Sequence, residues 1–417
     1  QPQQQQQLQL QQQQQLRRRR PQDRYVPKLP QAAGGSRRQN QKGNAMWSYQ
    51  KQCVFQNPDI SFASRLLAAL GILCIALVGL RILMSACRGL YHCLVGQYFG
   101  LNVDLTKFRG QWAVVTGASD GIGRAYAEQL AEKGLNIVLI ARTVSRLEDV
   151  AAVIRQAYKV DTKILSVDFS LSDRSPYEKI KELLAGLDVA VLVNNVGICY
   201  SYPEYFTLVP DGESLMDRII EANCTAATRM THIVLPKMVE RRAGVIINMS
   251  SFSSTTPFPL LSVYSGTKVY LNFFSDALAA EYRQFGITVQ CVKPFYVSTK
   301  MSRIPGGIYV PQPDALVRHA LTTVGLEMST YGCLSHKIHG YVHEVGLFFL
   351  PTWCRLQFSF FLMNSLRNIK YSKHNMTDRF KDTTKSSWSF VMLPFNLFAS
   401  ICVFVLTIKL PKRAFLW

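Results

Sequence analysis

The sequence lacks closely spaced cysteines. None of its ten cysteines forms a Cys-x-x-Cys pair, and no histidine cluster has the spacing of zinc ligands, so no metal site is expected. Several cysteines lie inside apolar runs, where a thiol behaves as a small hydrophobic group. These features argue against a disulfide framework and predict reduced thiols on the cytosolic side. The ten are Cys53, Cys74, Cys87, Cys93, Cys199, Cys224, Cys291, Cys333, Cys354 and Cys402.

Acidic residues are scarce outside the middle of the chain. Residues 101–310 hold 22 basic and 20 acidic side chains, whereas the two flanks together hold 25 basic and 7 acidic ones. A nucleic-acid-binding domain would carry its excess positive charge on the folded unit that docks. Basic flanks beside apolar segments instead indicate an anionic membrane surface, and no nucleic-acid partner is expected.

The first 60 residues have too few apolar side chains for a core. Twelve of the first fifteen residues are glutamine, and a run of arginines and a Pro-, Gly- and Arg-rich stretch follow. Such a segment cannot offset the entropy lost on ordering, so residues 1–60 are predicted to be disordered. Because the chain opens on Gln1, Met46 is a candidate start, in which case the glutamine tract carries no function.

A long apolar run follows this segment. Leu66–Leu80 contains no charged residue, and the run continues past Arg81 to Met84, close to the roughly 20 residues that a membrane-spanning helix needs. Residues 61–100 are therefore predicted to be a membrane anchor. A buried core helix is the alternative.

The C-terminal residues 341–417 are also predicted to be membrane-associated. The segment 345–363 is rich in aromatics but broken by Pro351 and Arg355, which suits a segment lying on the bilayer surface. Residues 390–408 form a possible second span, followed by basic residues.

Residues 101–340 alternate short β-branched runs with longer amphipathic stretches. Near-continuous apolar strands separated by helices are typical of a parallel sheet covered on both faces. We predict an α/β fold with a doubly wound, Rossmann-like parallel sheet and a site at the carboxyl edge of its strands. The predicted strands are Trp112–Thr116, Ile137–Ile140, Ile164–Val167, Val189–Val193, Val245–Met249 and Thr288–Val292.

A glycine-rich turn follows the first predicted strand, and a helix begins at about Ile122. Glycine lets the backbone turn tightly and approach a pyrophosphate, whose charge then faces the free amides of the helix N-terminus. This turn predicts a dinucleotide site. Its residues are Gly117, Ser119, Asp120, Gly121, Ile122 and Gly123.

Arg142 stands at the end of the second strand, where a sheet that binds NAD carries an acid for the ribose 2′-hydroxyl. A guanidinium neutralises a 2′-phosphate and binds it in a fork, whereas an acid repels it. Arg142 therefore predicts NADP(H) as the cofactor.

The candidate catalytic residues are Tyr264, Lys268, Ser251 and Asn223. The i, i+4 spacing of Tyr264 and Lys268 places both on one face of a helix. A phenol is a poor acid–base catalyst at neutral pH unless a cation stabilises the phenolate, and Lys268 supplies that charge. Ser251 ends a strand and can donate to a substrate oxygen, and Asn223 lies in a helix interior where a polar side chain has no local reason to be.

This ordered set of residues resembles the short-chain dehydrogenase/reductase family. Phrases such as VLVNNVG, YPEYF and VLPKMVERRAG are similar to the membrane-bound branch of very-long-chain 3-oxoacyl-CoA reductases, also called 17-beta-hydroxysteroid dehydrogenases. One departure is Phe295, which follows Pro294 where the family commonly has glycine, although this branch tolerates it.

The resemblance implies roles for the site residues. Tyr264 would donate a proton to the carbonyl, Lys268 would lower the pKa of Tyr264 and hold the nicotinamide ribose, and Ser251 would orient the carbonyl. Asn223 would support a proton-relay water. The resemblance adds further cofactor contacts: Asp168 near the adenine, Asn195 and Gly197 along the cofactor, and Thr299 at the nicotinamide carboxamide.

The predicted function is NADPH-dependent reduction of a very-long-chain 3-oxoacyl-CoA to the 3-hydroxyacyl-CoA in fatty-acid elongation. The first alternative is a 17-beta-hydroxysteroid dehydrogenase that acts on a steroid ketone. The second is a catalytically inactive binding protein of the same family, against which Tyr264 and Lys268 argue. The expected location is the endoplasmic reticulum membrane, with the active site facing the cytosol, and mitochondria are the alternative. The resemblance also implies a homodimer.

Overall fold

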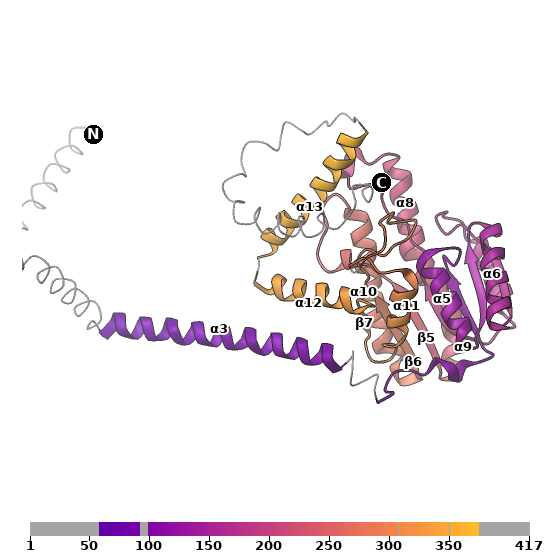
Figure 1. Ribbon diagram of the computed structural model, residues 1–417, viewed down its shortest axis with the longest axis horizontal. Helices are drawn as coiled ribbons and strands as arrows, with labels where there is room; N and C mark the ends of the chain where they lie inside the picture. Colours follow the sequence, from indigo (N-terminus) through magenta and orange to yellow (C-terminus); the bar gives the residue numbers. More distant parts are fainter. Residues whose placement is uncertain (1–57, 92–98, 308, 350, 375–417) are drawn as a thin grey trace, which may run out of the picture. The chain divides into compact units, whose positions relative to one another are not determined.

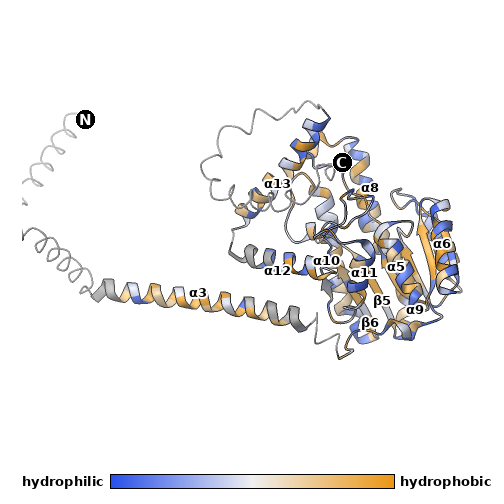
Figure 2. Ribbon diagram, in the orientation of Figure 1, coloured by the Kyte–Doolittle hydropathy of each residue, from blue (hydrophilic) through white to orange (hydrophobic). Residues whose placement is uncertain are grey.

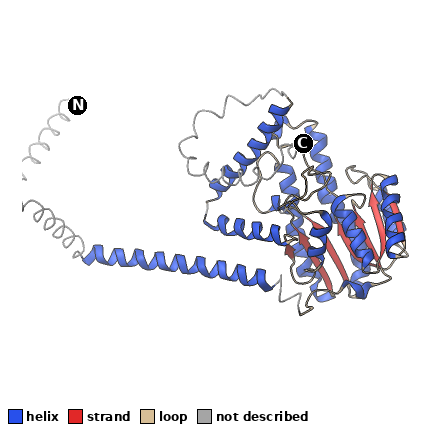
Figure 3. Ribbon diagram, viewed as in Figure 1, coloured by secondary structure: helices blue, strands red, loops and turns tan. Residues whose placement is uncertain are grey.

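The computed structural model describes residues 58–91, 99–307, 309–349 and 351–374. Its central feature is a parallel sheet (Figures 1 and 3). The strand order is β3-β2-β1-β4-β5-β6-β7. The predicted doubly wound fold and its six strands are confirmed, with shifts at the strand ends. The seventh strand was missed because two polar residues show no apolar pattern. The strands are β1 Trp112–Thr116, β2 Asn136–Ala141, β3 Thr162–Ser166, β4 Val189–Asn194, β5 Gly244–Met249, β6 Ile287–Val292 and β7 Ser329–Thr330.

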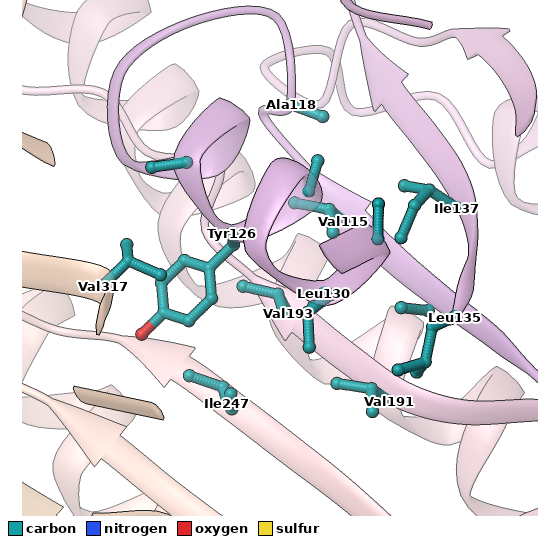
Figure 4. Close-up of a cluster of buried hydrophobic side chains, with 14 of the residues drawn as sticks. Val115, Ala118, Tyr126, Leu130, Leu135, Ile137, Val191, Val193, Ile247 and Val317 are labelled. Carbon is teal, nitrogen blue, oxygen red and sulfur yellow. The ribbon is translucent and has the colours of Figure 1, made fainter. Parts of the chain in front are cut away.

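Helices cover both faces of the sheet (Figure 3). Neighbouring residues on β1 point to opposite faces, so Val115 packs in one core with α5, α6 and α11, whereas Val114 packs in the other with α7, α9 and α10. Figure 4 shows Tyr126 and Leu130 of α5 in the first of these cores. The helices are α5 Gly121–Glu132, α6 Val144–Tyr158, α7 Ser175–Leu184, α8 Gly212–Ile220, α9 Ala226–Arg241, α10 Ser262–Tyr282 and α11 Pro313–Leu321.

The strand order reverses between β1 and β4, because β1 pairs with β2 on one side and with β4 on the other. Connections that leave the carboxyl ends of these two strands turn away in opposite directions, which opens a crevice above them. Thr116 ends β1, Asn194 ends β4 and Met249 ends β5. The predicted site residues follow these strand ends and therefore gather at one edge of the sheet.

Helix α3 (Pro58–Leu90) covers most of the predicted membrane anchor, residues 61–100. Its segment Ser64–Arg81 is long and apolar enough to cross a membrane, with a mean hydropathy of 1.8. Figure 2 shows this apolar character along the helix. Leu67 and Ile75 on this helix are 69% and 74% exposed. An exposed apolar helix of this length fits a membrane anchor.

Helices α12 (Leu334–Phe349) and α13 (Thr352–Lys373) follow the sheet. The segment predicted to lie on the bilayer is divided between them, and Pro351 caps α13. Helix α13 buries Cys354, Met363 and Arg367 against the rest of the protein. Residue 340, the predicted end of the reductase domain, lies inside α12. The predicted disordered segment, residues 1–60, lies outside the described residues except for its last three residues, which begin α3, so the prediction was wrong there. The possible span at 390–408 also lies outside the described residues.

Candidate active site

The glycine turn between β1 and α5 is built from backbone that side chains would obstruct. Gly117 and Gly121 have φ angles of +65° and +56°, in the left-handed region that favours glycine. A Cβ on Gly123 would lie 2.3 Å from the carbonyl oxygen of Gly117, so α5 packs directly on the turn. Asp120 caps α5 by accepting a hydrogen bond from the amide of Gly121. A helix N-terminus above a close-packed glycine turn fits the pyrophosphate of a dinucleotide.

Asn195 joins this turn to the neighbouring strand. Its Nδ2 donates to the carbonyl oxygens of Thr116 and Gly117 at 3.0 and 3.2 Å. In return, Thr116 Oγ1 accepts hydrogen bonds from the amides of Asn195 and Val196. These bonds fix the two sides of the crevice at the point where the strand order reverses. Asn195 therefore positions the backbone of the cofactor site.

Arg142 and Asp168 lie together at the ends of adjacent strands. Arg142 Nη1 is 3.8 Å from Asp168 Oδ2, and the arginine side chain is 63% exposed. Partial burial raises the pKa of Asp168, but hydrogen bonds from Ser170 and the charge of Arg142 outweigh it and hold that pKa below its ordinary value. The pair thus presents an exposed guanidinium beside an ionised acid, where the adenosine end of a cofactor is predicted to bind.

Tyr264 and Lys268 share one face of α10, as their spacing predicts. Lys268 Nζ lies 5.7 Å from the centre of the Tyr264 ring and donates to the carbonyl oxygen of Met249 at 2.9 Å. Met249 ends β5, two residues before Ser251, whose side chain caps the short turn Phe252–Ser254. Lys268 is thereby tied to the strand end that carries Ser251.

Asn223 lies in a π-helical turn, Glu221–Thr225, between α8 and α9. Its Oδ1 accepts from the amide of Ile198 at 2.7 Å, and its Nδ2 donates to the carbonyl of Ile198 and to Thr267 Oγ1. These partners satisfy a polar side chain that is almost fully buried. Asn223 therefore connects the segment after β4 to α10, next to Lys268.

Gly197 allows the side chains of Asn223 and Lys268 to lie close to the segment after β4. A Cβ at this position would lie 3.3 Å from both Asn223 Oδ1 and Lys268 Nζ. A larger residue would push the asparagine and the lysine apart. The structure thus brings all four predicted catalytic residues and Gly197 to one place.

Burial governs the proton affinities in this cluster. Burial raises the pKa of Tyr264 well above its ordinary value, the nearby Cys199 thiol raises it further, and a hydrogen bond with Ser251 lowers it. Burial also lowers the pKa of Lys268 to about 8. At neutral pH the phenol therefore keeps its proton and can donate it, and the amine beside it can exchange protons near neutral pH.

The segment after β6 returns to the glycine turn. A Cβ on Gly121 would lie 3.2 Å from Thr299 Cγ2, which places Thr299 beside the predicted pyrophosphate site. The next residue, Lys300, forms an ion pair with Asp120 at 2.5 Å. Ile122 packs against the cluster of side chains that follows β6, and Ser119 is partly buried in the turn. All predicted cofactor-binding residues therefore line one edge of the sheet.

Sequence reasoning missed three contributors to this site. Thr116 was read only as a strand end, and Thr267 only as a spacer between the tyrosine and the lysine, but both accept hydrogen bonds from site asparagines or their backbone. Phe295 stacks on Phe252, the residue that follows Ser251, with 3.5 Å between ring centres. The glycine-to-phenylalanine departure at Phe295 was the one available signal.

The fold and this site define an oxidoreductase with a nicotinamide cofactor, and comparisons with known proteins give the family. The short chain dehydrogenase family model matches residues 111–304. The very-long-chain 3-oxoacyl-CoA reductase of Macaca fascicularis is 43% identical over 300 residues, which cover 72% of this chain and 93% of that protein. The chain belongs to the short-chain dehydrogenase family.

Two further proteins show the extent of the similarity. The very-long-chain 3-oxoacyl-CoA reductase-B of Danio rerio is 50% identical over 234 residues, covering 56% of this chain and 75% of the relative. A solved 7beta-hydroxysteroid dehydrogenase structure has a TM-score of 0.51 and 24% identity, and covers 58% of this chain and all of that one. The latter supports the fold alone.

Proposed function

We propose that this chain reduces very-long-chain 3-oxoacyl-CoA to 3-hydroxyacyl-CoA with NADPH. The observation that carries the proposal is the joining of Ser251, Tyr264, Lys268 and Asn223 at one sheet edge by hydrogen bonds and close packing. Relatives named very-long-chain 3-oxoacyl-CoA reductase, 42–50% identical, support the substrate class.

The residues of the chain suit the reduction of a ketone. NADPH, when bound, would supply the hydride to the carbonyl carbon. Tyr264 donates its proton to the carbonyl oxygen, which completes the hydroxyl group, and Ser251 donates a hydrogen bond that orients the same oxygen. Lys268, whose pKa burial lowers to about 8, lies beside the phenol and returns a proton to it.

The cofactor is proposed to be NADPH rather than NADH because Arg142 is exposed at the end of β2. Its ion pair with Asp168 holds the guanidinium close to the predicted adenosine site. A 2′-phosphate would gain this positive charge. NADH would gain nothing from it.

Full-length protein in detergent provides the test. We expect NADPH oxidation with 3-oxostearoyl-CoA, and loss of at least about 100-fold in kcat for Tyr264→Phe, because general acid catalysis contributes that much. Tyr270→Phe is the matched control on the same helix, since Tyr270 is partly exposed and bonds Thr228. No activity above the Tyr264→Phe background would overturn the proposal.

The two alternatives are separated in the same assay. A steroid dehydrogenase would prefer estrone or androstenedione to the acyl-CoA by at least about tenfold in kcat/KM, since about 1.4 kcal/mol of transition-state binding separates a right from a wrong substrate. The 7beta-hydroxysteroid dehydrogenase structure does not favour this alternative, because it supports the fold alone. An inactive binding protein would show no turnover of either substrate.

We also propose a homodimer formed through α8 and α10. These two helices pack together and carry large apolar side chains that are exposed in the single chain: Ile220 on α8, and Tyr270 and Phe273 on α10. Exposed apolar surface of this kind marks a protein interface. We propose that a second copy of the chain covers this apolar surface of α8 and α10.

For location, we propose the endoplasmic reticulum membrane, with α3 as the anchor and the catalytic domain in the cytosol. The exposed apolar face of α3 and the free cysteines among the described residues support this arrangement. The basic flanks and residues 341–417 would add contact with the cytosolic leaflet. Protease added to intact microsomes should digest the catalytic domain, whereas full protection would contradict the cytosolic orientation.

A further inference from the structure

A buried ion pair joins α13 to the segment after β4. Arg367 Nε donates to Glu204 Oε1 at 2.6 Å, and each side chain is 1% exposed. Tyr371, one turn further along α13, donates its hydroxyl to the other carboxylate oxygen of Glu204. The guanidinium also lies over the rings of Tyr205 and Tyr371, at 4.9 and 4.2 Å from their centres. We call Glu204, Arg367 and Tyr371 the latch.

The latch is an unusual way to hold a helix in place. Removing two charges from water costs more than packing apolar side chains of the same size, unless hydrogen bonds satisfy both partners. Here Glu204 accepts from Arg367, Tyr371 and the amide of Tyr205, and two aromatic rings cover the cation. Such a pair fixes one relative position of its two segments, because a displacement would break several directional bonds at once.

The latch is connected to the start of α10 by one backbone hydrogen bond, and the Tyr200 side chain bonds the same part of the chain. The amide of Glu204 donates to the carbonyl of Leu260, just before α10 begins. The amide of Val263, which directly precedes Tyr264, donates to the hydroxyl of Tyr200. Tyr200 also packs with Leu261 and Val263 in a small apolar cluster. The position of α13 is therefore coupled to the residues that directly precede Tyr264.

Aromatic side chains flank the latch on both segments. Tyr205 meets Phe360 of α13 edge to face at 6.2 Å, and Tyr202 meets Tyr371 at 6.3 Å. Next to these pairs, Phe206 and Phe361 remain partly exposed. The latch thus holds the aromatic rings of the two segments in register. The backbone of Glu204 is bonded to Leu260, four residues before Tyr264. A long hydrocarbon chain needs an apolar surface to leave water, whereas a short acyl group has little chain to bury.

We propose that the latch determines the chain-length preference of the enzyme. By fixing α13 (orange to yellow in Figure 1) against Tyr202–Phe206, it builds the apolar wall that receives the distal part of a long acyl chain. Arg367 and Tyr371 are positioning residues that do not touch the reacting atoms. This inference rests on the proposed acyl-CoA reductase function.

The test compares two substrates of different length in full-length variants. Wild-type protein, Tyr371→Phe and Arg367→Met are assayed with NADPH and either 3-oxostearoyl-CoA or acetoacetyl-CoA. We expect Tyr371→Phe to raise KM for 3-oxostearoyl-CoA by about three- to tenfold, with kcat for acetoacetyl-CoA and its KM unchanged. Arg367→Met, which removes the cation that balances the buried Glu204 carboxylate, should have a larger effect on the long substrate. If Arg367→Met does not fold, Tyr371→Phe alone decides, because it removes one hydroxyl.

The matched control is a second buried ion pair, in which Lys337 Nζ donates to Glu327 Oε1 at 2.8 Å and both side chains are at most 4% exposed. Glu327→Gln should lower the melting temperature without changing the ratio of the two KM values. The latch proposal is overturned if Tyr371→Phe changes both substrates by the same factor, or if Glu327→Gln shifts the ratio equally. If wild-type protein reduces neither substrate, the proposed function itself fails.

Discussion

Lys268→Met should stabilise the protein at neutral pH while it removes activity. The Lys268 side chain is buried, and burial lowers its pKa from the ordinary value of 10.5 to about 8. At neutral pH this difference corresponds to about 3 kcal/mol of folding free energy spent on holding the charged amine inside. Methionine avoids that cost but loses the hydrogen bond to Met249, worth about 1–2 kcal/mol. The expected net gain is about 1–2 kcal/mol.

The pH dependence gives this prediction its sign. Because the pKa is lower in the folded state, the unfolded chain binds more protons between pH 8 and pH 10.5, and this lysine makes wild-type protein more stable as the pH rises through that window. The variant has no such group. The advantage of Lys268→Met should therefore shrink by about 3 kcal/mol across the window and reverse at its alkaline end.

Urea unfolding of full-length protein in detergent, at neutral pH and near pH 10.5, measures the difference. The thiols that face Lys268, those of Cys199, Cys224 and Cys291, are present in both proteins, so their titration largely cancels in the comparison. Lys181→Met is the control, because Lys181 is half exposed and pairs with Glu178 on the surface. A stability difference that stays constant with pH would refute the reasoning.

Three further perturbations test other parts of the site. Arg142→Ala should raise KM for NADPH by about tenfold and leave KM for NADH nearly unchanged, since a largely exposed charge contributes about 1.4 kcal/mol; equal changes in steady-state kinetics would contradict it. Gly123→Ala should abolish NADPH binding in a fluorescence titration, because its Cβ would lie 2.3 Å from the carbonyl oxygen of Gly117. An unchanged Kd for NADPH would argue against a pyrophosphate site at the glycine turn. Phe273→Glu should yield monomers in light scattering if α10 forms the dimer interface, whereas an unaltered mass would exclude that interface.

Much of the fold could be predicted from local patterns in the sequence. The strands of a covered parallel sheet are apolar on both faces, so runs such as Val189–Val193 were recognisable without any knowledge of their partners. The glycine turn was equally readable, because Gly117 and Gly121 adopt conformations that favour glycine. Such features depend on near neighbours in the chain, and the printed sequence contains those neighbours.

Contacts between distant segments could not be predicted in the same way. The partners of Asn223 are Ile198 and Thr267, which are 25 and 44 residues away in the sequence. Its π-helical turn has no sequence signature of its own, and the turn packs against α10. The packing of α13, which follows Pro351, against the segment after β4 was likewise not expected.

The sequence by itself determined the chemistry: a glycine turn for a dinucleotide, and a tyrosine and a lysine one helical turn apart on the same helix face. Those properties follow from residue type and short-range geometry. Tertiary structure decided which side chains surround the tyrosine, and it buried Arg367 against Glu204 across 163 residues of sequence. Such a pair forms only after the segments that carry it have packed, because its stability depends on the exclusion of water by the whole fold.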